Sequence, residues 1–210
     1  MSRYENAELG LYEGVGEYGI PQIQSVTELP DISRWIEFDY CQRLRKDRKD
    51  RTTIGVHFFE PDYKFERVWT CPDRYGEMLQ EFGCCMSPDF SMFMDFPKAL
   101  SIYNHYRKHF IARYWQEMYN ISVVPTIGWC GKDSYDWCFD GEPEGSIVAV
   151  SNVGCAINKE AKRIFTDGYK EMLIRLQPIK VLFFTRNFEE YPGPVQYIKW
   201  DIHKGDQLNG

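Results

Sequence analysis

Apolar segments with strand character alternate with segments of helical character between residues 52 and 185, and this alternation limits the possible folds more than any other feature. TIGVHFF (53–59), SIVAVS (146–151) and IKVLFFT (179–185) are apolar at nearly every position, as strands covered on both faces are. Segments long enough for helices separate them. Because strand–helix–strand units place their strands parallel in one sheet, the sequence predicts an α/β fold.

Five to seven strands and several helices fit the pattern. Further strands are expected at 34–40, 83–87, 121–129 and 195–200, a turn or short helix at 134–141, and helices at 72–82, 98–119 and 158–176. Two architectures remain open: a reduced, TIM-barrel-like arrangement of β/α units, or an open doubly wound parallel sheet. A complete eight-unit barrel typically needs about 250 residues, and this chain has 210.

The chain is expected to form a single β/α domain over residues 51–210. Residues 1–50 are expected to pack on it as an N-terminal arm followed by a basic loop. The arm, residues 1–30, contains several glycines, prolines and tyrosines without helical or strand periodicity. The loop, RLRKDRKDR (43–51), carries six basic and two acidic residues, which suits either a solvated surface or a contact for phosphate or an acidic partner.

Charge and cysteine usage exclude several classes of protein. The net charge of -6 and the pI of about 5.3 argue against a general polyanion-binding surface. Seven cysteines, an odd number without C-x-x-C spacing, favour reduced thiols in the cytoplasm. Neither a signal-peptide pattern nor an apolar run of about 18 residues is present, so no membrane association is expected.

Polar residues follow several of the predicted strands. In both architectures the ligand face lies at the carboxyl ends of the parallel strands. A carboxylate at such an end can act as general base, nucleophile or metal ligand. The candidate catalytic residues are therefore Asp89, His57 and Asp136, and the candidate ligand-binding residues are Trp129, Arg107, Arg113, Ser151, Asn152 and Arg186.

Each candidate also has a structural interpretation. Asp89 in PDFS can close an Asx-turn, and His57 can be a core histidine. Arg107 and Arg113 either form ion pairs or clamp an anion. Trp129 either belongs to the core or stacks on a base or sugar.

His105 and His109 are one helical turn apart, a spacing that can place two imidazoles on one metal ion. The glutamate of H-E-x-x-H is missing, and Arg107 and Lys108 lie between the histidines. We therefore expect a partly exposed helix surface, and we assign neither a metal nor a cofactor. The phosphate-binding glycine motifs and the G-x-S-x-G nucleophile motif are also absent.

Six segments of the chain resemble a family of bacterial and phage proteins known as the domain of unknown function DUF4417. They are VHFFEPDYKFERVW (56–69), SPDFSMFMDFP (87–97), NHYRKHFIARYWQ (104–116), VVPTIGWC (123–130), SYDWCFDGEPEGSIVAVSNVG (134–154) and DGYKEMLIRLQP (167–178). The resemblance covers roughly residues 50 to 185. It implies that the family's aspartate, arginine, tryptophan and serine positions correspond to Asp89, Arg107, Trp115, Trp129, Asp136 and Ser151, and it implies no activity.

Two functions are consistent with these features. The first is an enzyme or ligand-binding protein that acts on a nucleotide, nucleobase or sugar at the strand ends, where carboxylates, tryptophans and arginines converge. The alternative is a non-enzymatic phage accessory or inhibitor protein. It would bind a host protein or nucleic-acid complex through residues 43–51.

Overall fold

The computed structural model describes residues 5–10, 12–44, 50–155 and 158–199. Seven strands of the described chain form two parallel sheets, which confirms the predicted α/β class. One sheet has the order β3 (Arg34–Glu37), β4 (Ile54–His57), β5 (Cys84–Met86), β6 (Val123–Val124). The other has the order β7 (Ile147–Ser151), β8 (Lys180–Thr185), β9 (Val195–Lys199).

The two sheets meet at the end of β6. Thr126 and Ala149 form a parallel bridge there. The Ile127 amide donates to the Ala149 carbonyl at 2.9 Å, and the Ala149 amide donates to the Pro125 carbonyl at 2.8 Å. The strands therefore follow one another in chain order, and the described strands form no closed barrel.

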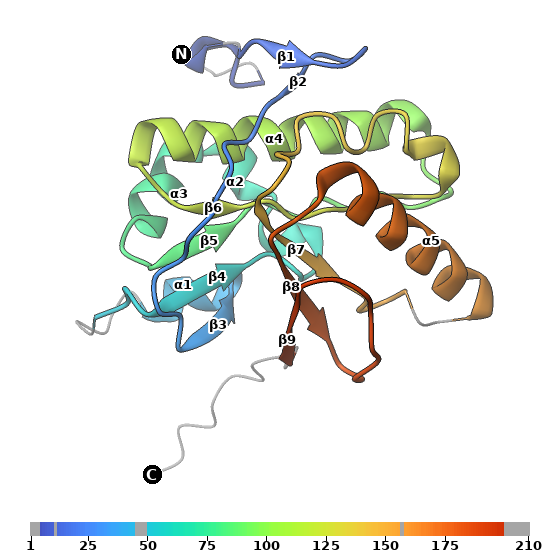
Figure 1. Ribbon diagram of the computed structural model, residues 1–210. Helices are drawn as coiled ribbons and strands as arrows, with labels where there is room; N and C mark the ends of the chain where they lie inside the picture. Colours follow the sequence, from blue (N-terminus) through green and yellow to red (C-terminus); the bar gives the residue numbers. More distant parts are fainter. Residues whose placement is uncertain (1–4, 11, 45–49, 156–157, 200–210) are drawn as a thin grey trace.

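The described residues also form five α-helices, which Figure 1 shows around the strands. They are α1 (Phe38–Leu44), α2 (Arg67–Thr70), α3 (Pro72–Leu79), α4 (Lys98–Tyr119) and α5 (Lys159–Leu176), with short 3-10 turns at η1 (Ala7–Leu9), η2 (Asp62–Lys64) and η3 (Lys132–Ser134). The predicted helix at 98–119 is confirmed at both ends. Among the described residues, no helix combines the length and the apolar character needed to cross a membrane.

Local chemistry explains where the two long helices begin and end. The Asn158 side chain accepts a hydrogen bond from the Ala161 amide, as an N-cap residue does, and α5 begins at the next residue. Asn120 and Gln177 follow the last residues of α4 and α5 in the left-handed conformation, which ends each helix.

Strands β7 and β8 are buried on both faces, as their apolar sequences predict. Val181 and Phe183 face α5, whereas Leu182 and Phe184 join the larger hydrophobic cluster that also contains residues of β3, β4, α3 and α4. Successive side chains of a strand point to opposite faces. The larger cluster is therefore built from both sheets.

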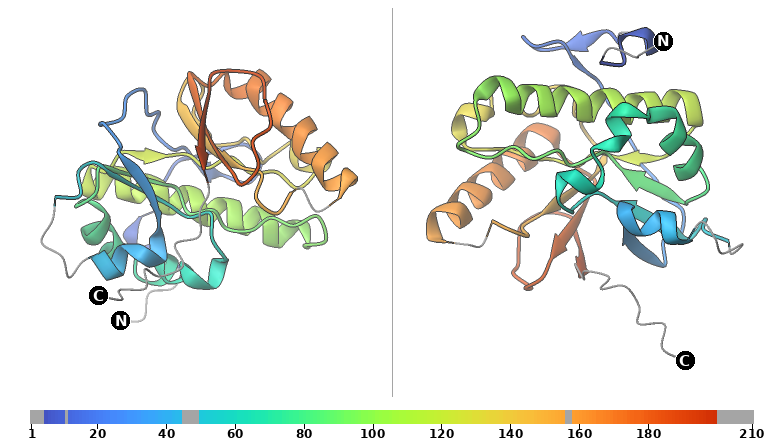
Figure 2. Two further views of the ribbon diagram at one scale, coloured as in Figure 1. Left: turned by 90° about the horizontal axis from the view of Figure 1, so that it is seen from below. Right: turned by 180° about the vertical axis from the view of Figure 1, so that it is seen from behind.

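The N-terminal arm, residues 12–30 of the described chain, begins on the side of α4 that faces away from the sheets and then runs past α4 toward β3 (Figures 1 and 2). It contains the two-residue strands β1 (Gly14–Val15) and β2 (Ile20–Pro21), which pair antiparallel. Ile20 and Ile23 are fully buried. The Ile23 amide donates to the Gly141 carbonyl at 2.9 Å, so the arm also joins the segment before β7.

The buried face of α4 differs from the face that the sequence predicts. Apolar residues recur along 98–119 at spacings of three and four, from Ala99 to Met118, and this pattern predicts one buried stripe. The prediction is wrong at both ends, since Ala99 and Met118 are exposed. The expectation that His105 and His109 lie on a partly exposed surface is also wrong: the two residues are 1% and 0% exposed. The arm and the segment before β7 cover these positions, which a local periodicity does not reveal.

Candidate functional site

The carboxyl ends of β5, β7 and β8 lie on the same side of the parallel strands, and three predicted site residues follow them. Asp89 comes three residues after β5, Asn152 directly after β7 and Arg186 directly after β8. Open parallel sheets bind ligands at this edge. We call the region formed by these strand ends the rim.

Asp89 is the half-buried carboxyl group of the rim. Burial raises its pKa to about 7, the nearby Lys108 ammonium opposes the rise, and the Asp62 carboxylate adds to it. A carboxyl group that titrates near neutral pH can both accept and donate a proton under physiological conditions. Asp89 therefore has the acidity that a general acid–base residue requires.

The loop that carries Asp89 is fixed by hydrogen bonds on both sides. The Asp62 carboxylate accepts from the Ser91 amide at 3.0 Å and from the Ser91 hydroxyl at 2.7 Å. The Asn104 side chain of α4 donates to the Ser91 carbonyl at 2.6 Å. Together these bonds set the position of Asp89 from η2 and from α4.

Arg107 holds the same loop through its side chain. Its guanidinium lies 3.8 Å from the centre of the Phe90 ring, a cation–π distance. It donates to the Asn104 side chain at 3.1 Å and pairs with Glu66. Because its donors contact protein groups and only 7% of the residue is exposed, Arg107 is placed to position the loop.

Lys108 connects the rim to the other side of α4. Its buried ammonium group donates to the Thr126 carbonyl at 2.8 Å and to the Glu142 carboxylate at 2.5 Å. The Thr126 hydroxyl in turn lies 2.8 Å from the Ser87 hydroxyl, just before Asp89. Sequence analysis missed Lys108 and Glu142, because only the fold brings residue 142 to α4.

An open cavity of about 320 Å³ lies at the ends of β7 and β8. Cationic, amide and aromatic side chains line it, including Lys162, Arg186, Asn152, Asn187, Phe165 and Tyr191. Cys155 lines it as well. Burial and, to a smaller extent, the Asp89 carboxylate raise the pKa of the Cys155 thiol to about 11.

Gly154, in the wall of the cavity, has a backbone conformation that other residues rarely adopt. Its φ of +90° favours glycine, and among the described residues other than its chain neighbours no atom lies within 4 Å of the position that a Cβ would take. The neighbouring Ser151 hydroxyl accepts from the Val153 amide at 3.2 Å and so stabilises the turn. Ser151 is not among the cavity-lining residues.

The other predicted site residues do not line this cavity. His57 ends β4, packs against Phe184 and lines a second cavity, of about 400 Å³, between β3 and β9. Trp129 is half-buried and donates to the Ile164 carbonyl of α5 at 3.2 Å. Arg113 pairs with Glu117 along α4.

Asp136 and the basic loop complete the set of predicted positions. Asp136 is exposed in the turn after η3. Within the loop 43–51, positions 45–49 lie outside the described residues. Arg51 is buried, pairs with Glu81 and donates to the Leu44 carbonyl at 2.6 Å. It therefore ties the ends of the loop to the domain.

Comparison with known proteins adds family relationships. A family model described as Domain of unknown function (DUF4417) matches residues 12–199. The Gene 1 protein of Mycobacterium phage D29 is 36% identical over 172 residues, which are 80% of this chain and 61% of that protein. The Gene 1 protein of Mycobacterium phage L5 is 33% identical over 174 residues, which are 82% of this chain and 73% of that protein. The chain thus spans less than two thirds of the D29 protein. No solved structure shows significant similarity.

Proposed function

This chain belongs to the DUF4417 family, whose description names no activity, and we propose from the rim geometry that it binds and processes a nucleotide or a phosphorylated sugar. The observation that carries the proposal is the cavity at the ends of β7 and β8. Its lining combines two cationic side chains, two amides and two aromatic rings. Small-molecule sites typically combine such apolar walls with a few convergent polar groups.

The cationic groups indicate an anionic ligand. Lys162 reaches the cavity from α5 and lies 2.8 Å from Glu189, which also lines it. Arg186 follows β8 directly, where a guanidinium suits the bidentate binding of a phosphate. Asn152 and Asn187 add amide groups that suit hydroxyl and base-edge recognition.

The carboxyl group of Asp89 supplies the reactive function in this proposal. Its pKa of about 7 lets it take a proton from the ligand or return one. The electrostatic effect of Asp89 on the thiol of Cys155, a residue that lines the cavity, supports this assignment. Ligand binding then depends on Arg186, whereas turnover depends on Asp89.

We also propose that the seven parallel strands form a reduced, open barrel. The strands follow in chain order, and the bridge between Thr126 and Ala149 links the two sheets. Trp35 of β3 contacts Phe184 of β8 edge to face, with ring centroids 5.8 Å apart. Residues of β3 and β9 line one shared cavity, which is consistent with two edge strands that face each other.

A thermal-shift screen tests ligand binding. Nucleoside monophosphates, free nucleobases and sugar phosphates are added one at a time to the wild-type protein, to Arg186→Ala and to Arg163→Ala. Arg163 is the matched control, because it lies on α5 and pairs with Glu160 and Asp167 at the exposed surface. A ligand at 100 times its Kd stabilises a protein by about 2.7 kcal/mol, or roughly 5–10 °C for a domain of this size.

The expected result is a shift for the wild type and Arg163→Ala that Arg186→Ala loses. A ligand that shifts all three proteins equally places binding elsewhere and contradicts the proposal. If no compound of the panel shifts the wild type, ligand binding at the rim is rejected. The alternative, binding of a host protein or nucleic-acid complex through residues 43–51, then becomes the hypothesis to test.

A further inference from the structure

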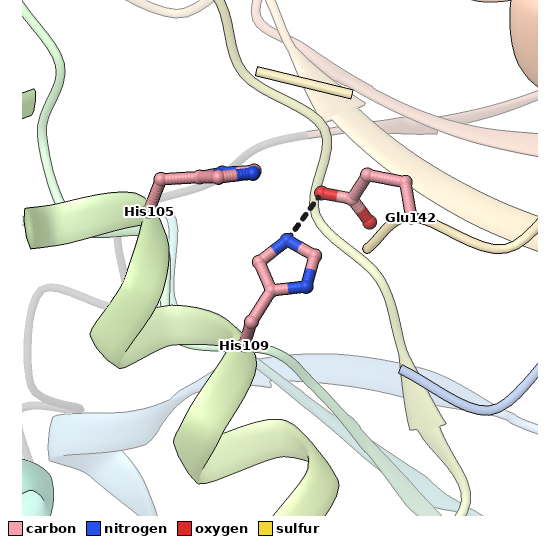
Figure 3. A group of neighbouring side chains, drawn as sticks. All are labelled: His105, His109 and Glu142. Atoms are coloured by element: carbon pink, nitrogen blue, oxygen red, sulfur yellow. Dashed lines mark hydrogen bonds and ion pairs between the residues drawn. The ribbon is translucent and has the colours of Figure 1, made fainter. Parts of the chain in front are cut away.

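Two histidines and a glutamate meet beneath the N-terminal arm, and none of the three lines the cavity at the rim. His105 and His109 lie one turn apart on α4, and Glu142 comes from the segment before β7. Figure 3 shows the two imidazoles and the carboxylate pointing toward one another. One nitrogen or oxygen atom from each residue lies within 4.8 Å of the others. The three residues are 1%, 0% and 5% exposed.

Hydrogen bonds to backbone carbonyls determine which imidazole nitrogens carry protons. His105 Nε2 lies 2.9 Å from the Asp140 carbonyl, and His109 Nδ1 lies 2.9 Å from the Pro21 carbonyl. A carbonyl oxygen only accepts hydrogen bonds, so each of these nitrogens donates. In a neutral ring the remaining nitrogen, His105 Nδ1 or His109 Nε2, carries a lone pair.

The other imidazole nitrogens and the Glu142 oxygens have lone pairs, and too few hydrogen-bond donors lie near them. His105 Nδ1 and Glu142 Oε2 are buried and form no hydrogen bond with any described residue. His109 Nε2 lies 3.1 Å from Glu142 Oε1, an oxygen that accepts a hydrogen bond from Lys108. Buried acceptors without a donor are costly in free energy. A cation between these atoms would satisfy all of them.

We propose that His105, His109 and Glu142 bind a divalent transition-metal ion, for which zinc is the best chemical match. Imidazole nitrogen and carboxylate oxygen are common zinc ligands, and two histidines with one glutamate form a known ligand set. Histidines that bind metals donate their other N–H group to a carbonyl or carboxylate. Both histidines of this cluster do so.

The surrounding chain gives the site a structural role. The Pro21 carbonyl comes from the N-terminal arm, the two imidazoles come from α4, and Glu142 precedes β7. A metal ion would therefore join α4 directly to the segment before β7, and the N-terminal arm would contact this site through the hydrogen bond between His109 and Pro21. The proposal concerns a different cluster from the cavity and does not depend on the proposed ligand.

The alternative for the same residues is a metal-free ion-pair network. A protonated His109 would donate to Glu142 through Nε2 and to Pro21 through Nδ1, and Lys108 would add a second positive charge. This arrangement leaves His105 Nδ1 without a donor. Metal content separates the two possibilities directly.

The test uses the whole chain, purified with an affinity tag that contains no histidine and without chelators. Inductively coupled plasma mass spectrometry is expected to find about one zinc ion per chain. His105→Gln is expected to lose the metal, and its matched control His57→Gln, which changes a buried histidine of β4, is expected to keep it. Metal content that is equal in the two variants would overturn the site.

A second measurement needs no variant and covers the case in which His105→Gln does not fold. The wild-type protein is stripped of metal, refilled with zinc and studied by zinc X-ray absorption. Two imidazole ligands and oxygen, together with a rise of the melting temperature on refilling, are the expected results. Sulfur ligands would assign the metal to cysteines and reject the proposal. A folded wild-type protein that takes up no zinc would also reject it.

Discussion

The Lys108 ammonium group lies 2.5 Å from the Glu142 carboxylate, and the two side chains are 4% and 0% exposed. A charge pair at this depth is strongly coupled, because little water screens it. Lys108 also donates to the Thr126 carbonyl at the end of β6 and lowers the pKa of Asp89 against the effect of burial. One side chain thus influences both the rim and the histidine cluster.

Replacing Lys108 by methionine is expected to destabilise the protein by about 3–5 kcal/mol, because it leaves a buried carboxylate without its ammonium partner. Urea denaturation measures the loss. Lys162→Met is the matched control: its pair with Glu189 is exposed, so it should cost less than about 1 kcal/mol. Equal losses for the two variants would show that the buried pair is not coupled as described.

The titration of Asp89 predicts how stability changes with pH. Folding raises its pKa from 3.8 to about 7, so between these values the folded state binds the proton more often than the unfolded state. The free energy of unfolding that Asp89 contributes therefore falls as the pH rises through this range. Asp89→Asn has no such titration, so the wild type should lose stability relative to the variant between pH 5 and pH 8.

Denaturation of both proteins at pH 5 and at pH 8 measures this difference. The contributions of the other titrating groups are nearly the same in the two proteins and largely cancel. A difference that does not change with pH would mean that Asp89 titrates normally. Turnover of any substrate found in the screen should fall strongly in Asp89→Asn, whereas ligand binding should persist.

Gly141 allows the N-terminal arm to approach α4 closely. A Cβ at this position would lie 2.6 Å from the Pro21 carbonyl oxygen and 2.7 Å from His109 Nδ1, and the φ is +76°. We expect Gly141→Ala to destabilise the protein well beyond the roughly 1–2 kcal/mol of a left-handed residue, because the arm must move.

Gly145→Ala is the matched control for this clash. Gly145 also has a positive φ, +63°, but no atom of a described residue beyond its two chain neighbours lies within 4 Å of its Cβ position. Urea denaturation of the two variants separates the backbone cost from the steric cost. If both lose the same stability, the arm does not pack against residue 141 as the structure describes.

Replacing Arg107 is expected to cost more stability than replacing Arg113, which lies on the same helix. Arg107→Lys loses the planar contact with Phe90 and the donors to Asn104 and Glu66, which a lysine cannot reproduce. A loss of about 1–3 kcal/mol is expected. Arg113→Lys, which changes a partly exposed pair with Glu117, should cost less than about 0.5 kcal/mol. Similar losses would contradict a positioning role for Arg107.

The periodic elements were predictable because their signals are local. The predicted helix at 98–119 matches α4 at both ends, and the apolar segment 179–185 contains β8. The predicted strand at 121–129 is shorter, because Pro125 has no N–H group to extend the pairing beyond β6. Beyond it the chain pairs only through the bridge at Thr126.

The candidate site was only partly predictable, because its groups come from distant segments. Asp89, Asn152 and Arg186 follow strands, and parallel strand ends share an edge, so their placement at the rim follows from the topology. His109 is buried because the arm and residue 142 cover it, 88 and 33 positions away. Contacts between such distant segments cannot be predicted from the local periodicity of the sequence.

The contacts of Val26 with the start of β7 affect how the chain assembles on the ribosome. The Val26 amide donates to the Ser146 hydroxyl at 2.9 Å across 120 residues of sequence, and the Ile147 amide donates to the Val26 carbonyl at 2.8 Å. Synthesis at about 5–20 residues per second makes the arm wait on the order of 6–25 seconds for these partners. The arm is therefore synthesised well before its partners at the start of β7, and its apolar residues Ile20 and Ile23 stay accessible to chaperones until those partners emerge.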